Sequence, residues 1–279
     1  MSTRGRKEEV VYLTSLGSLD LYPNNTPCTF TNYLIPPIYL DSRREYEVGL
    51  VSILYPKHFY AITKGDSLFS ISFISRIGED EFKYTYTPNV NILAGDMSHI
   101  VEILNNEIYE RLKVHLENYN IESIVRNQAL FSWNGNNVKI HCTRGEEKNK
   151  LQISITFSSG IGEVLGYRSD TLYTFHAKDL YSEYIVNPIK ASPLKGVEYL
   201  YVYCDAIVPT YFGGQLVNVL DCFPLKTNFN KGINNTIYRR VNKLNIGDIS
   251  LFITDQKGRR IPFAEGDGIT CILHFREIM

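Results

Sequence analysis

The feature that most constrains this chain is a succession of short segments rich in β-branched and aromatic residues. β-Branched and aromatic side chains favour pleated, half-buried strands, whereas the Pro, Gly and Asn residues between the segments favour turns. Because helical patterns do not alternate with these segments, an antiparallel sandwich or barrel is expected rather than a parallel α/β sheet. The predicted strands cover residues 10–16, 29–34, 45–55, 68–75, 81–87, 137–143, 151–157, 199–208, 216–225, 237–244, 249–254 and 269–275.

Two polar segments predict hairpin turns. The sequence RGEEKNK at 144–150 separates the predicted strands 137–143 and 151–157, which are expected to pair with each other. The sequence DQKG at 255–258 follows the strand at 249–254 and has the residues that a tight turn requires.

One segment has a helical period instead. Its apolar residues recur about every four positions, which predicts a one-sided amphipathic helix on the outside of a sheet. Asp96 or Ser98 can cap its start, and a second, short helix is expected at 161–165. We expect an N-terminal arm at 1–9 and one β domain at 10–279, with a helical insertion at about 96–127. The apolar stripe is Ile100, Val101, Leu104, Ile108, Leu112 and Leu116.

Composition limits the function. The 279 residues are 44% hydrophobic and 21% charged, which is typical of a folded chain with a sizeable core. The formal net charge of −1 argues against a protein whose main task is to coat nucleic acid, and it permits close association between copies.

The cysteines and the N-terminus indicate a reducing compartment. Five widely spaced cysteines cannot pair completely within one chain, so free and mostly buried thiols are expected. The N-terminal sequence MSTRGRKEE lacks the apolar run of a signal peptide, and no stretch approaches the roughly 20 apolar residues of a membrane span. Arg4, Arg6 and Lys7 are candidates for an inward arm that contacts the genome weakly or a neighbouring subunit; the alternative is a solvated, frayed end.

The sequence offers no catalytic, cofactor or metal site. The segment LQISITFSSGIGEVLG at 151–166 resembles a dinucleotide-binding turn, but its glycine spacing is one residue too long and no βαβ unit surrounds it. Cys271 and His274 are three residues apart on a predicted strand, so their side chains are expected on opposite faces. There is no Gly-x-Ser-x-Gly nucleophile elbow, and we therefore expect no catalytic residue, cofactor or metal.

Aromatic residues are the remaining excess, with 20 Tyr and 14 Phe. Tyr199, Tyr201 and Tyr203 alternate with Leu200, Val202 and Cys204, which predicts a strand covered on both faces. Most aromatic residues are expected to fill the core and coat the sheets. Those in predicted loops are candidates for a subunit interface, where aromatic side chains are enriched. These candidates are Tyr22, Pro23, Asn24, Tyr211 and Phe212.

An ordered set of motifs spans nearly the whole chain. It begins with DLYPNNTPCTFTNYLIPPIYLDSRREYEVGLVSILYPK at 20–57 and continues with FSSGIGEVLGY at 157–167. It goes on with YLYVYCDAIVP at 199–209 and ends with TDQKGRRIPF and LHFR between 254 and 276. This set resembles the penton, or minor capsid protein, of Polinton (Maverick) elements and adintovirus-like double-stranded DNA viruses.

The resemblance implies a non-enzymatic virion protein with a single jelly-roll β-sandwich, the inserted amphipathic helix and the short second helix. Such a protein forms homopentamers at the five-fold vertices of an icosahedral capsid, contacts the major capsid protein, and is assembled in the reducing cytoplasm or nucleus of the host cell.

Three alternatives stay open. The first is a compact major capsid protein with two jelly rolls, against which stands the number of predicted strands, about a dozen where two such domains need sixteen. The second is a lectin-like ligand-binding sandwich, and the third is an enzyme on a cupin-like barrel.

Overall fold

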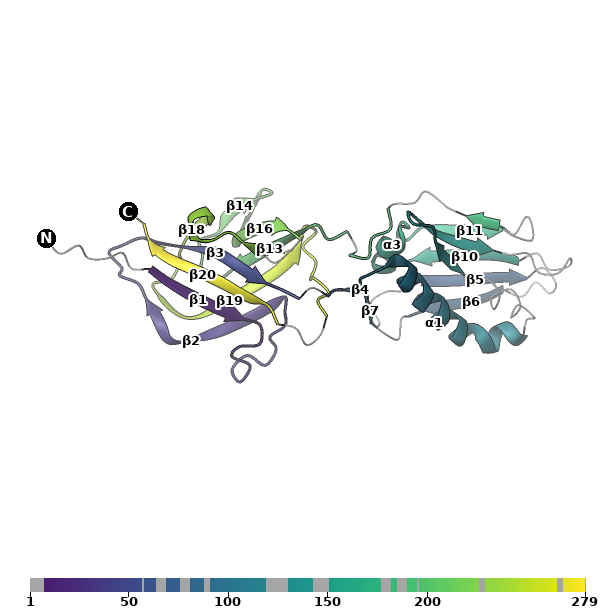
Figure 1. Cartoon of the computed structure of the whole chain (residues 1–279), viewed down its shortest axis with the longest axis horizontal. Coiled ribbons are helices and arrows are strands. Elements are labelled where there is room, and N and C mark those ends of the chain that lie inside the picture. Colours follow the sequence, from purple (N-terminus) through teal and green to yellow (C-terminus); the bar gives the residue numbers. More distant parts are fainter. Residues whose placement is uncertain are drawn as a thin grey trace. The chain divides into compact units, whose positions relative to one another are not determined.

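The structure is a computed structural model, and it divides the chain into two compact units (Figure 1). The sandwich unit comprises Met1–Lys57 and Val197–Met279, and the inserted unit comprises His58–Gly196. The structure describes residues 8–56, 58–63, 69–75, 81–87, 91–118, 130–142, 151–176, 182–184, 190–194, 196–225, 229–264 and 268–278.

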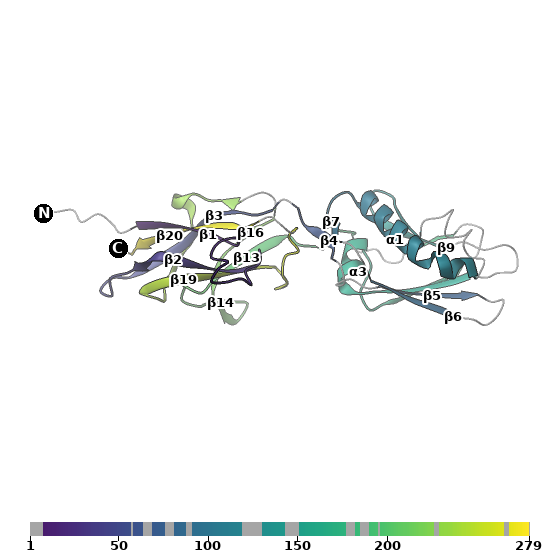
Figure 2. The same cartoon turned by 90° about the horizontal axis from the view of Figure 1, so that it is seen from below.

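The sandwich unit consists of two antiparallel sheets, which Figure 2 shows as two layers. The first has the order β1-β20-β3-β17, with β18 also paired to β3, and the second has the order β16-β13-β19-β2. The strands of the first sheet are β1 (Glu8–Thr14), β20 (Thr270–Glu277), β3 (Tyr46–Leu54), β17 (Phe229–Asn230) and β18 (Tyr238–Arg240). Those of the second are β16 (Val219–Pro224), β13 (Tyr199–Cys204), β19 (Asn245–Asp255) and β2 (Thr29–Tyr39).

The pairing of these strands is that of a jelly roll. The first strand pairs with the last, β2 with β19, β3 with β17 and β18, and β13 with β16. Such a pattern arises when one long antiparallel hairpin folds over on itself, so that successive pairs fall alternately into two sheets. The predicted all-β class and single jelly roll are therefore confirmed. The inserted unit enters between the third strand, β3, and the fourth, β13.

The core of the sandwich follows from strand alternation. On β13 every second residue is fully buried, and the same holds for the middle of β19 and for the inner face of β20. Burying a Leu, Ile, Val or Phe side chain stabilises the fold by about 1.5–3 kcal/mol, before the cost in conformational entropy. The residues concerned are Leu200, Val202, Cys204, Ile249, Leu251, Ile253, Cys271, Leu273 and Phe275.

The inserted unit combines three sheets with two helices. Its sheets have the orders β11-β10-β5-β6, β12-β9-β8 and β4-β7. Their strands are β4 (Tyr60–Ile62), β5 (Phe69–Ser75), β6 (Glu81–Tyr86), β7 (Ile92–Leu93), β8 (Phe131–Trp133), β9 (Val138–Cys142), β10 (Leu151–Phe157), β11 (Leu172–His176) and β12 (Ser182–Tyr184). The helices are α1 (Met97–Asn118) and α3 (Ser159–Leu165).

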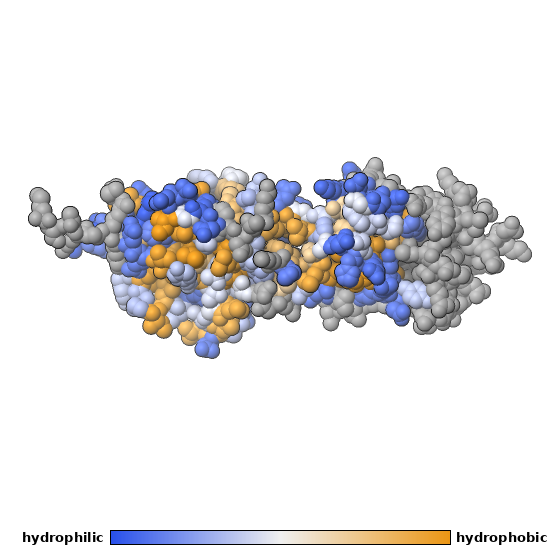
Figure 3. All heavy atoms as spheres, in the orientation of Figure 1, coloured by the Kyte–Doolittle hydropathy of each residue, from blue (hydrophilic) through white to orange (hydrophobic). Residues whose placement is uncertain are grey.

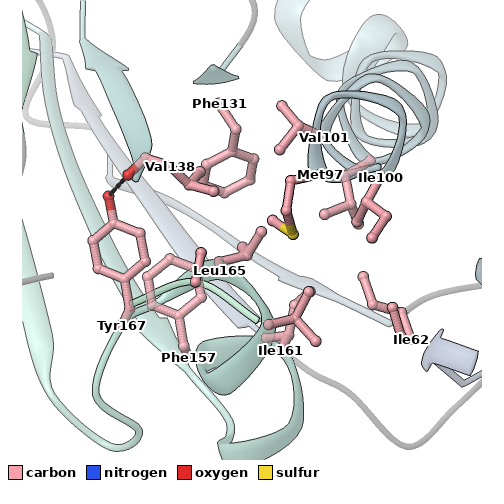
Figure 4. Packing of buried hydrophobic residues seen from close by; sticks show 14 of the residues in the cluster. Ile62, Met97, Ile100, Val101, Phe131, Val138, Phe157, Ile161, Leu165 and Tyr167 are labelled. Atoms are coloured by element: carbon pink, nitrogen blue, oxygen red, sulfur yellow. Dashed lines mark hydrogen bonds between the residues drawn. The ribbon is translucent and has the colours of Figure 1, made fainter. Parts of the chain in front are cut away.

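Helix α1 packs by the apolar stripe that the sequence predicts. Ile100, Val101, Leu104 and Ile108 are buried in a cluster with β8, β9, β10 and α3 (Figure 4). The Asp96 carboxylate accepts a hydrogen bond from the Ser98 amide, 3.0 Å away, so the predicted cap at Asp96 is confirmed. The predicted second helix is confirmed as α3.

The insertion is larger than the sequence analysis predicts. Instead of a helical segment at about 96–127 within one domain, it begins at His58 and contains four of the predicted strands. The cause is strand pairing, because β5, β6, β9 and β10 pair only within the inserted unit, among the described residues. Strand composition predicts that a segment is a strand and not which sheet it joins.

Two further predictions need correction. The strands at 137–143 and 151–157 do not form a hairpin, because β9 pairs with β8 and β12, and β10 pairs with β5 and β11. Asn134 instead makes the turn before β9, its side-chain oxygen accepting hydrogen bonds from two amides. The strand count also fails as an argument against two jelly rolls, since the described residues form twenty strands. The turn predicted at 255–258 is confirmed, with Gly258 at φ +75°.

Gly162 and Gly166 have structural roles in and after helix α3. A Cβ atom on Gly162 would lie 2.8 Å from the Tyr167 carbonyl oxygen, and Gly166 ends α3 in the left-handed conformation at φ +82°. The Tyr167 hydroxyl donates a hydrogen bond to the Val138 carbonyl oxygen at 2.7 Å (Figure 4). The interpretation that this segment is not a nucleotide-binding turn agrees with this geometry, because helix α3 is short and buried.

Candidate subunit interface

The outer side of the β16-β13-β19-β2 sheet is lined by aromatic side chains, and we call it the aromatic face. Tyr199, Tyr201 and Tyr203 point outward from β13, because Leu200, Val202 and Cys204 point inward. Phe252 on β19 lies beside Tyr203, with the ring centroids 5.8 Å apart. Tyr199 remains 44% exposed and Phe252 36% exposed.

At the positions that alternate with the core in the described strands, the aromatic face carries one charged side chain, Asp248 on β19, and the others are uncharged. Depletion of charge together with enrichment in Tyr and Phe is the compositional signature of an interface core. The outward positions are Thr29, Thr31, Tyr33, Tyr199, Tyr201, Tyr203, Cys222, Pro224, Asp248, Ser250, Phe252 and Thr254.

A two-stranded hairpin lies on the aromatic face. It consists of β14 (Thr210–Phe212) and β15 (Gln215–Val217), joined by two glycines with positive φ angles, as a tight hairpin turn requires (Figure 2). Phe212 contacts Tyr201 edge to face, with the ring centroids 5.5 Å apart. Because side chains alternate, Tyr211 and its partner Leu216 point away from the sheet, and they are 78% and 60% exposed.

The other predicted interface residues lie in the loop between β1 and β2, which reaches the same sheet. The Tyr22 hydroxyl donates a 3.3 Å hydrogen bond to the Asp248 carboxylate on β19. Partial burial and this carboxylate raise the pKa of Tyr22, so its hydroxyl stays protonated at neutral pH. Pro23 and Asn24 are exposed.

The Asn25 side chain holds this loop in place. Its amide nitrogen donates to the carbonyl oxygens of Gly17 and Thr31, and its oxygen accepts from the Thr31 amide.

The structure thus brings both predicted loop sets to one side of one sheet, where Phe212 contacts β13 and Tyr22 contacts β19. Their role in subunit contact stays a prediction. The predicted arm residues Arg4, Arg6 and Lys7 lie outside the described residues.

Sequence reasoning missed a second exposed apolar surface, on the outer side of the opposite sheet. We call it the β1 face. It consists of Val10 and Tyr12 on β1 with Leu54 on β3, which are 48%, 69% and 47% exposed, and of the less exposed Ile272 on β20. Ile272 pairs directly with Tyr12. Figure 3 shows hydrophobic residues over β1 and β20 on this side. The alternation of residues 8–14 could have indicated it.

Paired charges flank the β1 face. His274, only 1% exposed, lies 2.7 Å by Nδ1 from the Tyr238 hydroxyl and 3.7 Å by Nε2 from the Glu8 carboxylate. The Arg276 guanidinium lies 3.5 Å from the centre of the Tyr238 ring and donates to Glu47 at 2.7 Å. His274 is therefore a hydrogen-bonded histidine in a polar network, and Cys271 faces the core.

The described thiols are free, and three of them are buried. Burial raises the pKa of Cys28 to about 11 and that of Cys204 to about 12, and it also raises the pKa of Cys271. These thiols therefore stay protonated and unreactive at neutral pH. Cys222, on the aromatic face, is exposed.

Within the described part of the chain, no three His, Cys, Asp or Glu side chains come together as a metal site would require. None of the helices described is both long enough and apolar enough to span a membrane.

Comparison with known proteins gives similarities to solved structures and none to a family model or curated sequence. No protein-family model matches the chain. No curated protein matches its sequence. Among solved structures, the chain is similar to the crystal structure of a selenomethionine-labelled mavirus penton protein, with 10% sequence identity and a TM-score of 0.44. The match covers 98% of this chain and 100% of that one.

Proposed function

We propose that this chain is a structural, non-enzymatic virion protein, the penton capsomer of an icosahedral capsid. In this proposal it forms homopentamers at the five-fold vertices and contacts the major capsid protein of the same virus or element. The single observation that carries the proposal is the aromatic face with its apolar hairpin. An exposed aromatic surface of this kind is typical of a contact with another protein subunit. The ordered sequence motifs give the kind of assembly.

The area of this face supports a role in assembly. Tyr199, Tyr211, Phe212, Leu216 and Phe252 together expose about 500 Å² of mostly apolar surface, taking roughly 200 Å² for a large side chain. The largest apolar patch on a typical monomer is about 300–600 Å² and is often functional. A patch at the upper end of this range, formed by uncharged side chains and held on a sheet, favours a protein partner.

The sandwich suits this role mechanically. Two packed sheets form a stiff body, and copies related by a closing rotation can bury such a surface around a ring. The formal net charge of −1 leaves little long-range repulsion between copies.

The mass of the full chain in solution tests the proposal. Light scattering after size exclusion is expected to give about 160 kDa, five times the chain mass of 32.0 kDa, and negative-stain micrographs are expected to show rings. Tyr211→Glu is expected to reduce the assembled fraction, because it places a charge on the apolar hairpin. Leu172→Glu is the matched control, since Leu172 is 66% exposed on β11 of the inserted unit.

The proposal would be ruled out if the purified chain stays monomeric at high concentration, both alone and when it is mixed with the major capsid protein. Binding to a glycan array by such a monomer would favour the lectin-like alternative instead.

A further inference from the structure

We propose that the aromatic face of one copy binds the β1 face of the next copy, so that the contact between subunits is heterologous. This inference rests on the proposed self-assembly and names the two surfaces that would meet. The aromatic face lies on the outer side of one sheet of the jelly roll, and the β1 face lies on the outer side of the other. Each copy would then contribute both halves of a repeating contact.

The exposed apolar area of the aromatic face matches the apolar area that one partner buries in an interface of standard size. A stable interface covers roughly 800 Å² on each partner, of which about 56–65% is apolar. That share is about 450–520 Å², which the five exposed side chains of the aromatic face supply by themselves. The aromatic face therefore provides the apolar core of one complete subunit contact.

We infer the partner surface of the aromatic face from the other apolar surface that the chain exposes, the β1 face. If two aromatic faces met symmetrically, Tyr12, the most exposed residue of the β1 face at 69%, would stay in water together with Val10 and Leu54. Pairing the aromatic face with the β1 face buries both apolar surfaces through one kind of contact. An isologous pair also ends at a dimer, whereas a heterologous contact can continue around a ring.

Charge is compatible with this contact. The ionised groups that flank the β1 face already have partners, since Arg276 binds Glu47 and Glu8 lies beside His274. The uncharged side chains of the aromatic face separate none of these pairs when they are placed over them. The Asp248 carboxylate, the charged group of the aromatic face, keeps the Tyr22 hydroxyl as a hydrogen-bond donor.

A mixing experiment with two damaged copies distinguishes the two geometries. Tyr211→Glu damages the aromatic face, and Tyr12→Glu damages the β1 face; both side chains are highly exposed, so the fold is expected to persist. Circular dichroism and thermal unfolding check the fold of each variant. The masses of the wild type, of each variant alone and of an equimolar mixture are then measured by light scattering.

The heterologous contact predicts that each variant alone is monomeric at concentrations where the wild type is assembled. A loss of affinity on the order of 100-fold is expected for a charge placed in an interface core. The mixture is expected to form 1:1 heterodimers of about 64 kDa, twice the chain mass, because one intact aromatic face meets one intact β1 face.

The opposite results would overturn the inference. If Tyr12→Glu assembles like the wild type and the mixture contains no heterodimer, the aromatic face pairs with itself or with another surface, and the heterologous contact is wrong while self-assembly stands. If the wild type itself never assembles, the proposed function fails together with this inference. Leu172→Glu again serves as the control that changes an exposed apolar residue on neither face.

Discussion

A buried ion pair links the edges of the two sheets of the jelly roll. Its removal should destabilise the sandwich unit and leave the stability of the inserted unit unchanged. The Lys231 ammonium, just after β17 of one sheet, donates to the Asp221 carboxylate on β16 of the other at 2.7 Å. The Asp221 side chain is 1% exposed and that of Lys231 is 18% exposed. The other oxygen of the carboxylate accepts a hydrogen bond from the Cys222 amide at 2.8 Å.

Lys231→Met removes the cation and leaves the Asp221 carboxylate buried without it. Breaking a buried pair in this way costs about 3–5 kcal/mol, and the partial exposure of Lys231 favours the lower end, about 3 kcal/mol. For a unit of about 140 residues, with an unfolding entropy of about 2.1 cal/mol/K per residue, this corresponds to a melting temperature lower by about 10 °C.

The chain has an internal reference for this measurement. Its single Trp, Trp133, packs against the core of the inserted unit, so Trp fluorescence reports that unit alone. Scanning calorimetry follows the unfolding of the sandwich unit. Wild type and variant are measured at the same protein concentration, because association between copies would shift the melting temperature. The Trp133 transition is expected to stay in place while the sandwich transition falls.

Two further variants sharpen the interpretation. Asp221→Asn with Lys231→Met keeps an acceptor for the Cys222 amide without a buried charge, and it is expected to recover most of the lost stability. Arg43→Met breaks an exposed ion pair, in which the Arg43 side chain is 89% exposed and that of Asp41 is 41% exposed. This change should lower the free energy of unfolding by less than about 1 kcal/mol. A sandwich transition within about 2 °C of the wild type in Lys231→Met would refute the reasoning.

Three other predictions concern the cores of the two units. Tyr167→Phe removes the buried hydrogen bond to the Val138 carbonyl and should destabilise the inserted unit by about 1–3 kcal/mol, measured by denaturant unfolding followed by Trp fluorescence. Gly162→Ala brings a methyl group against the Tyr167 carbonyl and should lower the same transition by about 1–3 kcal/mol, whereas an unchanged midpoint would contradict this packing. Burial raises the pKa values of Cys28 and Cys204 to about 11 and about 12, so these thiols stay protonated in the folded state at a pH where they ionise in the unfolded state. The stability of the sandwich unit should therefore fall as pH rises from about 9 to 11. Cys→Ala at both positions should reduce that fall, and the part that remains is expected from Cys271, whose pKa burial also raises.

The sequence by itself determined which side of each strand faces the core. On β13 the alternation of Leu200, Val202 and Cys204 with three tyrosines predicts the inner and outer faces correctly, because side chains on a strand alternate with period two. The stripe of helix α1 is predictable for the same kind of reason, since its period is that of a helix. These are local properties, set by the geometry of a single element.

Only the tertiary structure decided which strands pair and which surfaces lie together. The strands at 137–143 and 151–157 look like a hairpin, yet they join different sheets, because pairing depends on packing across the whole inserted unit. Tyr22 contacts Asp248 across 226 positions of sequence, and Phe212 reaches Tyr201 only because a tight hairpin folds back onto its own sheet. The aromatic face and the β1 face are therefore products of the fold: residues far apart in the chain form one surface only after the jelly roll has closed.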